Sequence, residues 1–215
     1  MRAAAPIPGE SWPHEMVIAV EDSPHALLEL LWVREAWQLS PEGGDLPPLL
    51  DRTPELEERT AVTVEERASW TRGWPLLWRS ALAFAGKEFD QEAAALLPRT
   101  VDASAERARL IARLTGPRWL DRFGPRALTA SFLRWQERER TVLGLRRPLS
   151  LDDTPERRSL DALVPAWRRG LRTVVVVPCR GAFARPVGAS ALVLTERDRR
   201  DERRFTEVLQ GYRTE

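Results

Sequence analysis

The chain has few of the residues that most often carry chemistry. Its 215 residues include one cysteine, Cys179, and two histidines, His14 and His25. A single cysteine cannot form an internal disulfide, which agrees with a reducing compartment. Zinc sites need three or four converging ligands, and the sequence contains neither an HExxH motif nor paired CxxC motifs. We therefore expect no metal site and no cofactor.

Long apolar runs are also absent. The run Thr173–Val177 is far shorter than the roughly 20 residues that span a bilayer. The N-terminal sequence MRAAAPIPGESWP lacks the continuous apolar segment of a secretory signal. These absences predict a soluble, cytoplasmic protein with no membrane partner.

Common nucleophile and nucleotide motifs are missing too. Ser190 in GASAL departs from the GxSxG pattern, and neither GxxxxGK[ST] nor GxGxxG occurs. Cys179 precedes Arg180, which favours a thiolate, but a thiol nucleophile also needs an imidazole nearby. The favoured interpretation of Cys179 is a buried structural cysteine at the end of a strand.

Arginine is abundant, since the 33 basic residues include a single lysine, Lys87. Hydrophobic residues make up 43% and charged residues 30% of the chain, which is typical of a folded globular protein. The net charge is −8 in residues 1–100, +4 in 101–145 and +5 in 146–215. Either the acidic half packs beside the basic half, or the basic half presents a surface to an acidic partner.

Helical patterns fill the first two thirds of the chain. Ser23 and Pro24 provide an N-cap and a first-turn proline for a helix that ends near Ser40. The proline-rich connection 41–60 is either an arm that wraps around the body or a flexible excursion. Thr63 with Glu66 then forms a capping box that opens the next helix.

That next helix carries three tryptophans in the stretch WTRGWPLLW. Trp70, Trp74 and Trp78 share one helical face with leucine and alanine, which is typical of a packing face. The alternative is an exposed aromatic shelf for a ligand, with Trp70 and Trp74 as binding residues. Gly73 and Pro75 predict a kink or a restart of the helix between them.

The last third of the chain changes to strands. The β-branched run in 171–179 and the run in 189–196 predict an antiparallel pair, and Met16–Val20 supplies a third strand. A C-terminal helix should cover one face of this sheet. The predicted fold is α+β and predominantly α-helical, with a small antiparallel sheet of two or three strands.

The predicted domain organisation is simple. Residues 1–13 form a loose N-terminal tail. Residues 14–215 form a single compact domain, with a helical body at about 14–145 and an α+β part at about 146–215.

The loop CRGAFARPVG, between the two predicted strands, is the main candidate site. Arg180 and Arg185 are placed to clamp a carboxylate or phosphate, and Phe183 supplies an apolar tip. The plain alternative is that this loop is only a connection.

Three classes of function remain open. The leading hypothesis is a non-enzymatic protein-interaction module, such as an adaptor, inhibitor or immunity-like binder, that uses the 41–60 connection or the 179–188 loop to bind a protein partner. The second is a small-ligand-binding protein or enzyme built on Arg180 and Arg185. The third is nucleic-acid association through the C-terminal arginines, which interspersed acidic residues weaken. A homo-oligomer is compatible with all three.

Overall fold

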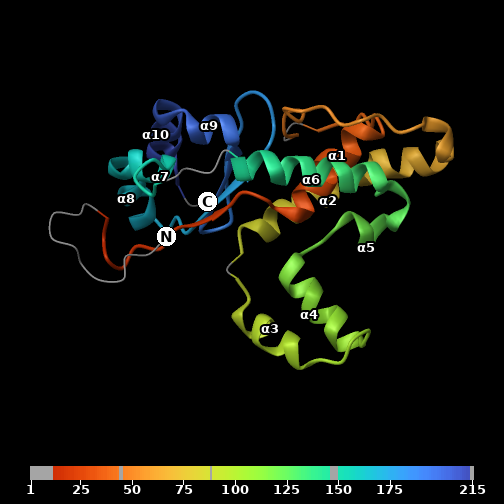
Figure 1. Ribbon diagram of the computed structural model, residues 1–215, viewed down its shortest axis with the longest axis horizontal. Coiled ribbons are helices and arrows are strands. Elements are labelled where there is room, and N and C mark those ends of the chain that lie inside the picture. Colours follow the sequence, from red (N-terminus) through yellow and green to blue (C-terminus); the bar gives the residue numbers. More distant parts are fainter. Residues whose placement is uncertain (1–11, 44–45, 88, 146–149, 214–215) are drawn as a thin grey trace.

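Helices dominate the protein, as predicted, and lie on both sides of a small sheet (Figure 1). The computed structural model describes residues 12–43, 46–87, 89–145 and 150–213. The helices are α1 (His25–Ala36), α2 (Val64–Ala85), α3 (Gln91–Leu96), α4 (Ala105–Thr115), α5 (Trp119–Phe123), α6 (Ala130–Leu145), α7 (Pro155–Arg158), α8 (Leu160–Arg168), α9 (Glu196–Arg200) and α10 (Glu202–Gly211). The strands are β1 (Ala19–Glu21), β2 (Thr173–Val177), β3 (Ala184–Val187) and β4 (Ala191–Thr195). The predicted α+β class is therefore confirmed.

The sheet is mixed, with the strand order β1-β2-β4-β3. β1 and β4 both run parallel to β2, and only the edge strand β3 is antiparallel to its neighbour β4. The predicted antiparallel pairing of β2 with β4 is therefore wrong. The reason is that residues 184–187, which we predicted as loop, form β3. This strand carries the chain back along the sheet, so β4 can start again in the direction of β2.

β2 is buried on both faces, which explains its unbroken run of valines. Val175 and Val177 belong to the core on the side of α1 and α2, whereas Val174 and Val176 belong to the core on the side of α8 and α10. A strand covered on both sides needs no alternation of polar and apolar residues. The predicted cover by the C-terminal helix is confirmed by the buried side chains of Phe205, Leu209 and Tyr212.

The tryptophan face of α2 is part of the core. Trp70, Trp74 and Trp78 are all buried, and the indole Nε1 of Trp74 donates to the carbonyl oxygen of Leu30 on α1 at 2.8 Å. The packing-face interpretation is confirmed, and Trp70 and Trp74 form no exposed shelf. α2 also continues through Pro75, so the alternative of a helix restart at Gly73–Pro75 is wrong.

The N-terminal segment is attached to the body at Trp12. This indole is buried against the core beside α8 and α10, and its Nε1 donates to the carbonyl oxygen of Met16 at 3.0 Å. Residues 1–11 of the predicted loose tail lie outside the described residues. β1 then pairs with β2, so the beginning and the last third of the chain share one sheet.

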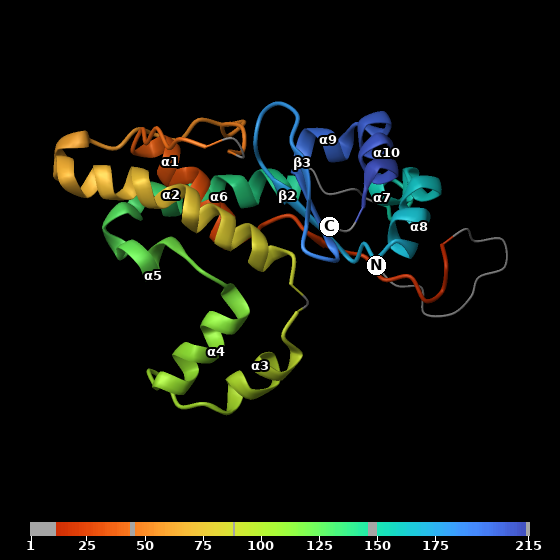
Figure 2. The same cartoon turned by 180° about the vertical axis from the view of Figure 1, so that it is seen from behind.

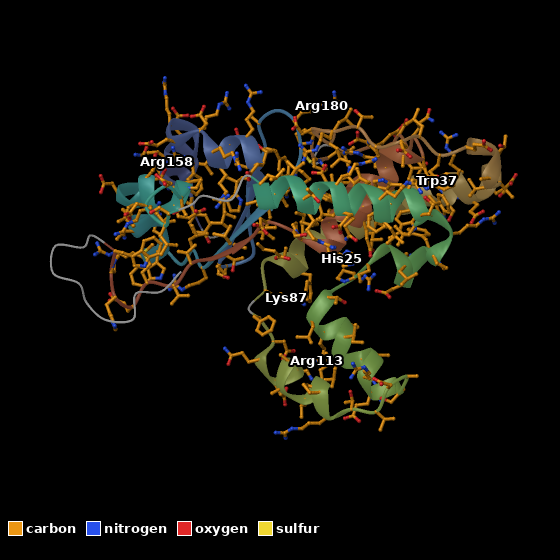
Figure 3. All side chains as sticks on the ribbon, viewed as in Figure 1. His25, Trp37, Lys87, Arg113, Arg158 and Arg180 are labelled. Atoms are coloured by element: carbon orange, nitrogen blue, oxygen red, sulfur yellow. The ribbon has the colours of Figure 1, made fainter. Side chains whose placement is uncertain are left out.

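α3 and α4 form a hairpin that projects from the body (Figures 1 and 2). Arg113, marked in Figure 3, joins α4 to Asp90 at 2.8 Å and to Glu92 at 2.7 Å. Gly116, at the end of α4, has a φ of 69°, and a Cβ there would overlap the ring of Phe84 on α2. A glycine is therefore required where the hairpin rejoins the body.

We predict that Trp74→Ala lowers the free energy of unfolding by about 3–5 kcal/mol, because it leaves a cavity in the core and removes the hydrogen bond from the indole to Leu30 O. Leu76→Ala on the same helix should change it by less than about 0.5 kcal/mol, since Leu76 is 61% exposed. Urea denaturation followed by circular dichroism measures both. Equal losses for the two variants would contradict this description of the core.

Candidate ligand-binding site

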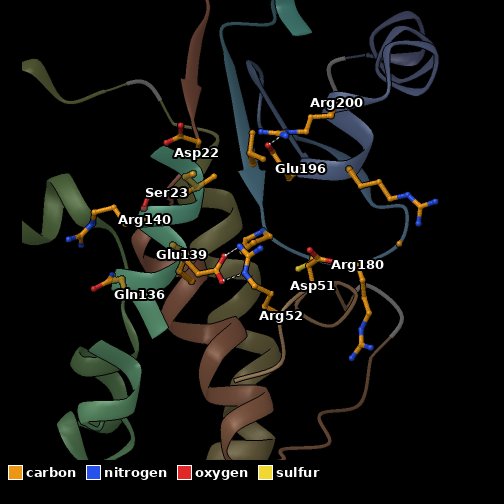
Figure 4. A pocket seen from close by; sticks show the side chains of 17 residues that line it. Asp22, Ser23, Asp51, Arg52, Gln136, Glu139, Arg140, Arg180, Glu196 and Arg200 are labelled. Atoms are coloured by element: carbon orange, nitrogen blue, oxygen red, sulfur yellow. Dashed lines mark hydrogen bonds and ion pairs between the residues drawn. The ribbon is translucent and has the colours of Figure 1, made fainter. Parts of the chain in front are cut away.

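A cavity of about 260 Å³ opens at the carboxyl ends of the three parallel strands (Figure 4). We call it the strand-end cavity. Its lining comes from residues that follow β1, β2 and β4, from the connection between α1 and α2, and from α6. The charged lining residues are Asp22, Asp51, Arg52, Glu139, Arg140, Arg180, Glu196, Arg197 and Arg200. The apolar floor consists of Leu28, Leu143, Val176 and Pro178.

Residues 46–52 of the long connection run beside the end of β2, and we call them the arm; Asp51 and Arg52 of the arm line the cavity. Leu50 forms an antiparallel bridge with Cys179 just beyond β2. Asp51 N donates to Pro178 O at 2.8 Å, and Arg180 N donates to Leu49 O at 2.8 Å. The interpretation of the connection as a wrap-around arm is thus confirmed for these residues.

Two adjacent side chains of α1 hold the arm. Arg34 donates from its two terminal nitrogens to Pro47 O at 2.7 Å and Pro48 O at 2.6 Å. Glu35 accepts from Leu50 N at 2.5 Å. Both side chains are buried, and desolvation lowers the pKa of Arg34 and raises the pKa of Glu35. The pair is therefore costly to bury, and its hydrogen bonds to the arm offset that cost.

The arm is joined to α6 by an ion pair at the cavity wall. Arg52 donates from Nε and Nη2 to the two carboxylate oxygens of Glu139, at 2.7 and 2.5 Å. Glu139 is buried, and its hydrogen bonds raise the pKa of Arg52. This bidentate geometry fixes the orientation of both side chains.

Two acidic side chains position the segments on the β4 side of the cavity. Asp198 accepts from Phe183 N at 2.8 Å and from the Thr195 hydroxyl at 3.0 Å. Glu196, which lines the cavity, pairs with Arg200. These contacts fix the start of α9 against the loop that follows β2.

Of the predicted site residues, only Arg180 lines the strand-end cavity. Its side chain is exposed and points away from the Arg52–Glu139 pair in Figure 4. Phe183 is half-buried against the core, and Arg185 lies in β3 and does not line the cavity. The two arginines are therefore not brought together around this cavity, and Trp70 and Trp74 are in the core.

Most residues around the cavity were not predicted from the sequence. Asp22, Ser23 and Arg197 directly follow strands, and this position would have identified them if the strands had been taken as parallel. No local sequence pattern marks Asp51 and Arg52 as cavity residues, because their placement depends on the path of the arm.

Cys179 is a buried structural cysteine, as the sequence favours. Burial raises the pKa of its thiol to about 12, so the thiolate is scarce at neutral pH. His25 lies 3.7 Å from Glu29, and it does not line the cavity. Within the described ranges, no group of three or more His, Cys, Asp or Glu side chains is arranged to hold a metal ion.

Many of the C-terminal arginines are engaged within the molecule. Arg199 forms a bidentate pair with Glu156 at 2.7 and 3.0 Å, and Arg204 lies 3.4 Å from Asp198. Arg169 donates to the carbonyl oxygens at the end of α10. These contacts reduce the charge that the cluster offers to a phosphate backbone.

Comparison with known protein families, with curated proteins and with solved structures found no match for this chain. Among the helices that the structure describes, none combines the length and the apolar character needed to cross a membrane.

We predict that Cys179 reacts slowly with the disulfide reagent DTNB at pH 8 in the native protein, because the thiol is buried and its pKa is about 12. Adding guanidinium chloride should release one reactive thiol per chain. A fast, complete reaction without denaturant would show that the strand end is open to solvent.

We also predict that Arg34→Ala lowers the free energy of unfolding by about 3–5 kcal/mol, because it leaves Glu35 buried without its cation. Hydrogen exchange at the Leu50 and Asp51 amides should accelerate as the arm detaches. Arg34→Lys, which keeps the charge but not the fork, should lose less stability. The matched control is Arg79→Ala, an exposed position on α2. If exchange at the arm stays unchanged in Arg34→Ala, Arg34 does not anchor it.

Proposed function

We propose that the protein binds a small organic molecule in the strand-end cavity. The supporting observation is that charged side chains from the arm, from α6 and from the ends of three parallel strands meet around an apolar floor. Open sheets with parallel strands hold ligands beyond the carboxyl ends of those strands. Small-molecule sites also combine an apolar lining with a few fixed polar groups.

The size of the cavity limits the ligand. Sites for drug-sized molecules enclose roughly 300–1,000 Å³, and the strand-end cavity measures about 260 Å³. A metabolite with the dimensions of an amino acid or a short organic acid fits this space, whereas a dinucleotide does not. The arm and Glu139 limit the cavity on one side through the Arg52–Glu139 ion pair.

The predicted role as a protein-interaction module remains a prediction, and we rank it second. It depended on the 41–60 connection and the 179–188 loop as docking segments. The arm within the first segment is hydrogen-bonded to Pro178 and Arg180, and part of the second segment forms β3. Backbone that is already paired offers fewer groups to a partner, whereas the cavity is open for a small ligand.

We predict that filling the cavity abolishes ligand binding. Leu143→Trp on α6 places an indole at the cavity floor, and Leu133→Trp is the matched control, since Leu133 is 63% exposed on the same helix and does not line the cavity. The measurement is the ¹H–¹⁵N correlation spectrum during titration with a library of small charged fragments. Fragments should shift amides around Val176 and Gly181 in the wild type and in Leu133→Trp only.

A library that shifts no amide around the cavity would argue against the proposed function. Fragments that bind Leu143→Trp as tightly as the wild type would place the binding site elsewhere on the molecule.

A further inference from the structure

Four charged side chains at the strand-end cavity have no side-chain hydrogen bond or ion pair within the described part of the chain. They are Asp22, Asp51, Arg180 and Arg197. The other cavity charges are matched differently: Arg52 pairs with Glu139, Arg200 with Glu196, and Arg140 with Glu137 at 2.7 Å. These four side chains include both signs, so the cavity offers complementary charge to a cation and to an anion.

The two signs lie at different strands. Asp22 follows β1, whereas Arg180 follows β2 and Arg197 lies in α9, directly after β4. Neighbouring strands are about 4.8 Å apart, so β1 and β4, with β2 between them, are separated by about 10 Å. Figure 4 shows Asp22 and Arg180 on opposite sides of the Arg52–Glu139 pair.

The second acid, Asp51, is the neighbour of Arg52 in the arm. Its charge helps to raise the pKa of Arg52, after the larger effect of the hydrogen bonds that Arg52 donates to Glu139. Asp51 is therefore partly compensated by a cation of the cavity wall. The charge of Asp22 likewise helps to raise the pKa of Arg199, after the larger effects of Glu156 and Glu196. What distinguishes Asp22 is its place, because it lies on the opposite side of the Arg52–Glu139 pair from Arg180 and so faces the cation of an extended ligand.

The cavity lining also includes apolar side chains. Leu28, Leu143, Val176 and Pro178 lie there, and desolvation of such a surface favours a hydrocarbon chain. A ligand that satisfies the whole site has an ammonium at one end, a carboxylate at the other and methylene groups between them.

From this arrangement we infer that the strand-end cavity selects a zwitterion whose opposite charges are separated along an apolar chain, such as an ω-amino acid. The inference rests on the proposed function, because it names the ligand class of the same cavity. The ammonium binds at Asp22, and the carboxylate binds at Arg180 and Arg197. An α-amino acid with an uncharged side chain is disfavoured, because its ammonium and carboxylate are attached to the same carbon and cannot reach both sites.

Isothermal titration calorimetry with 6-aminohexanoate tests the inference. Its isomer norleucine has the same atoms with adjacent charges, while hexanoate and hexylamine each lack one charge. We expect 6-aminohexanoate to bind at least about tenfold more tightly than each of the other three, since each of them loses the charged hydrogen bonds at one end of the cavity.

Variants of the charged side chains show which of them binds each end of the ligand. Asp22→Asn should weaken 6-aminohexanoate by about tenfold or more and leave hexanoate unchanged. The combination of Arg180→Gln with Arg197→Gln should weaken 6-aminohexanoate and hexanoate alike. The matched control is Asp161→Asn, an exposed acid on α8 away from the cavity, which should leave every affinity unchanged.

Several outcomes overturn the inference. These are equal binding of norleucine and 6-aminohexanoate, an affinity that Asp22→Asn does not change, or no binding of 6-aminohexanoate at all. If fragments still shift the cavity amides and Leu143→Trp abolishes the effect, the proposed function survives and only the ligand class is wrong. If no fragment shifts the amides around the cavity either, both the proposed function and the inferred ligand class are contradicted.

Discussion

The forked hydrogen bonds from Arg34 to the carbonyl oxygens of Pro47 and Pro48 hold the arm in place, and the site depends on them. Proline has no backbone N–H, so these residues can be fixed through the backbone only by a donor from outside. Arg34 supplies two donors from inside the core, and Glu35 accepts from Leu50 N further along the arm. The arm then reaches β2 in the right register and places Arg52 against Glu139. Without this anchor, one wall of the cavity would be missing.

The opposite wall of the cavity depends in turn on the direction of the strands. Because β1, β2 and β4 are parallel, the residues that follow them meet at one edge of the sheet. Asp22, Arg180 and Arg197 are far apart in sequence and become neighbours only through this arrangement. Antiparallel pairing of β2 with β4 would have placed Arg180 and Arg197 at opposite ends of the strands. The candidate site is thus a product of topology more than of any local motif.

Much of the fold could be predicted from the sequence, because it depends on local patterns. The caps at Thr63 and Ser104, the tryptophan spacing on α2 and the apolar stripe of α10 each indicate their element directly. Strand direction could not be predicted in the same way, since a short connection between two strands favours antiparallel pairing unless a further strand returns the chain between them. The unbroken valine run of β2 did carry a signal, because strands buried on both faces are typical of parallel sheets. Glu139 also carried one: it lies four residues after Trp135, on the inner face of α6. The path of the arm had no local signal, because Arg34 and Glu35 meet it only in the folded chain.

The edge strand β3 has a consequence for how the molecule associates with copies of itself. Pro186 lies in the middle of this strand, and Arg185 precedes it. A proline interrupts the row of amide donors that an incoming strand needs, and a charged neighbour resists desolvation. This side of the sheet is therefore a poor template for β-augmentation, domain swapping or fibril growth. The segment that reverses the chain between β2 and β4 thus also terminates the sheet.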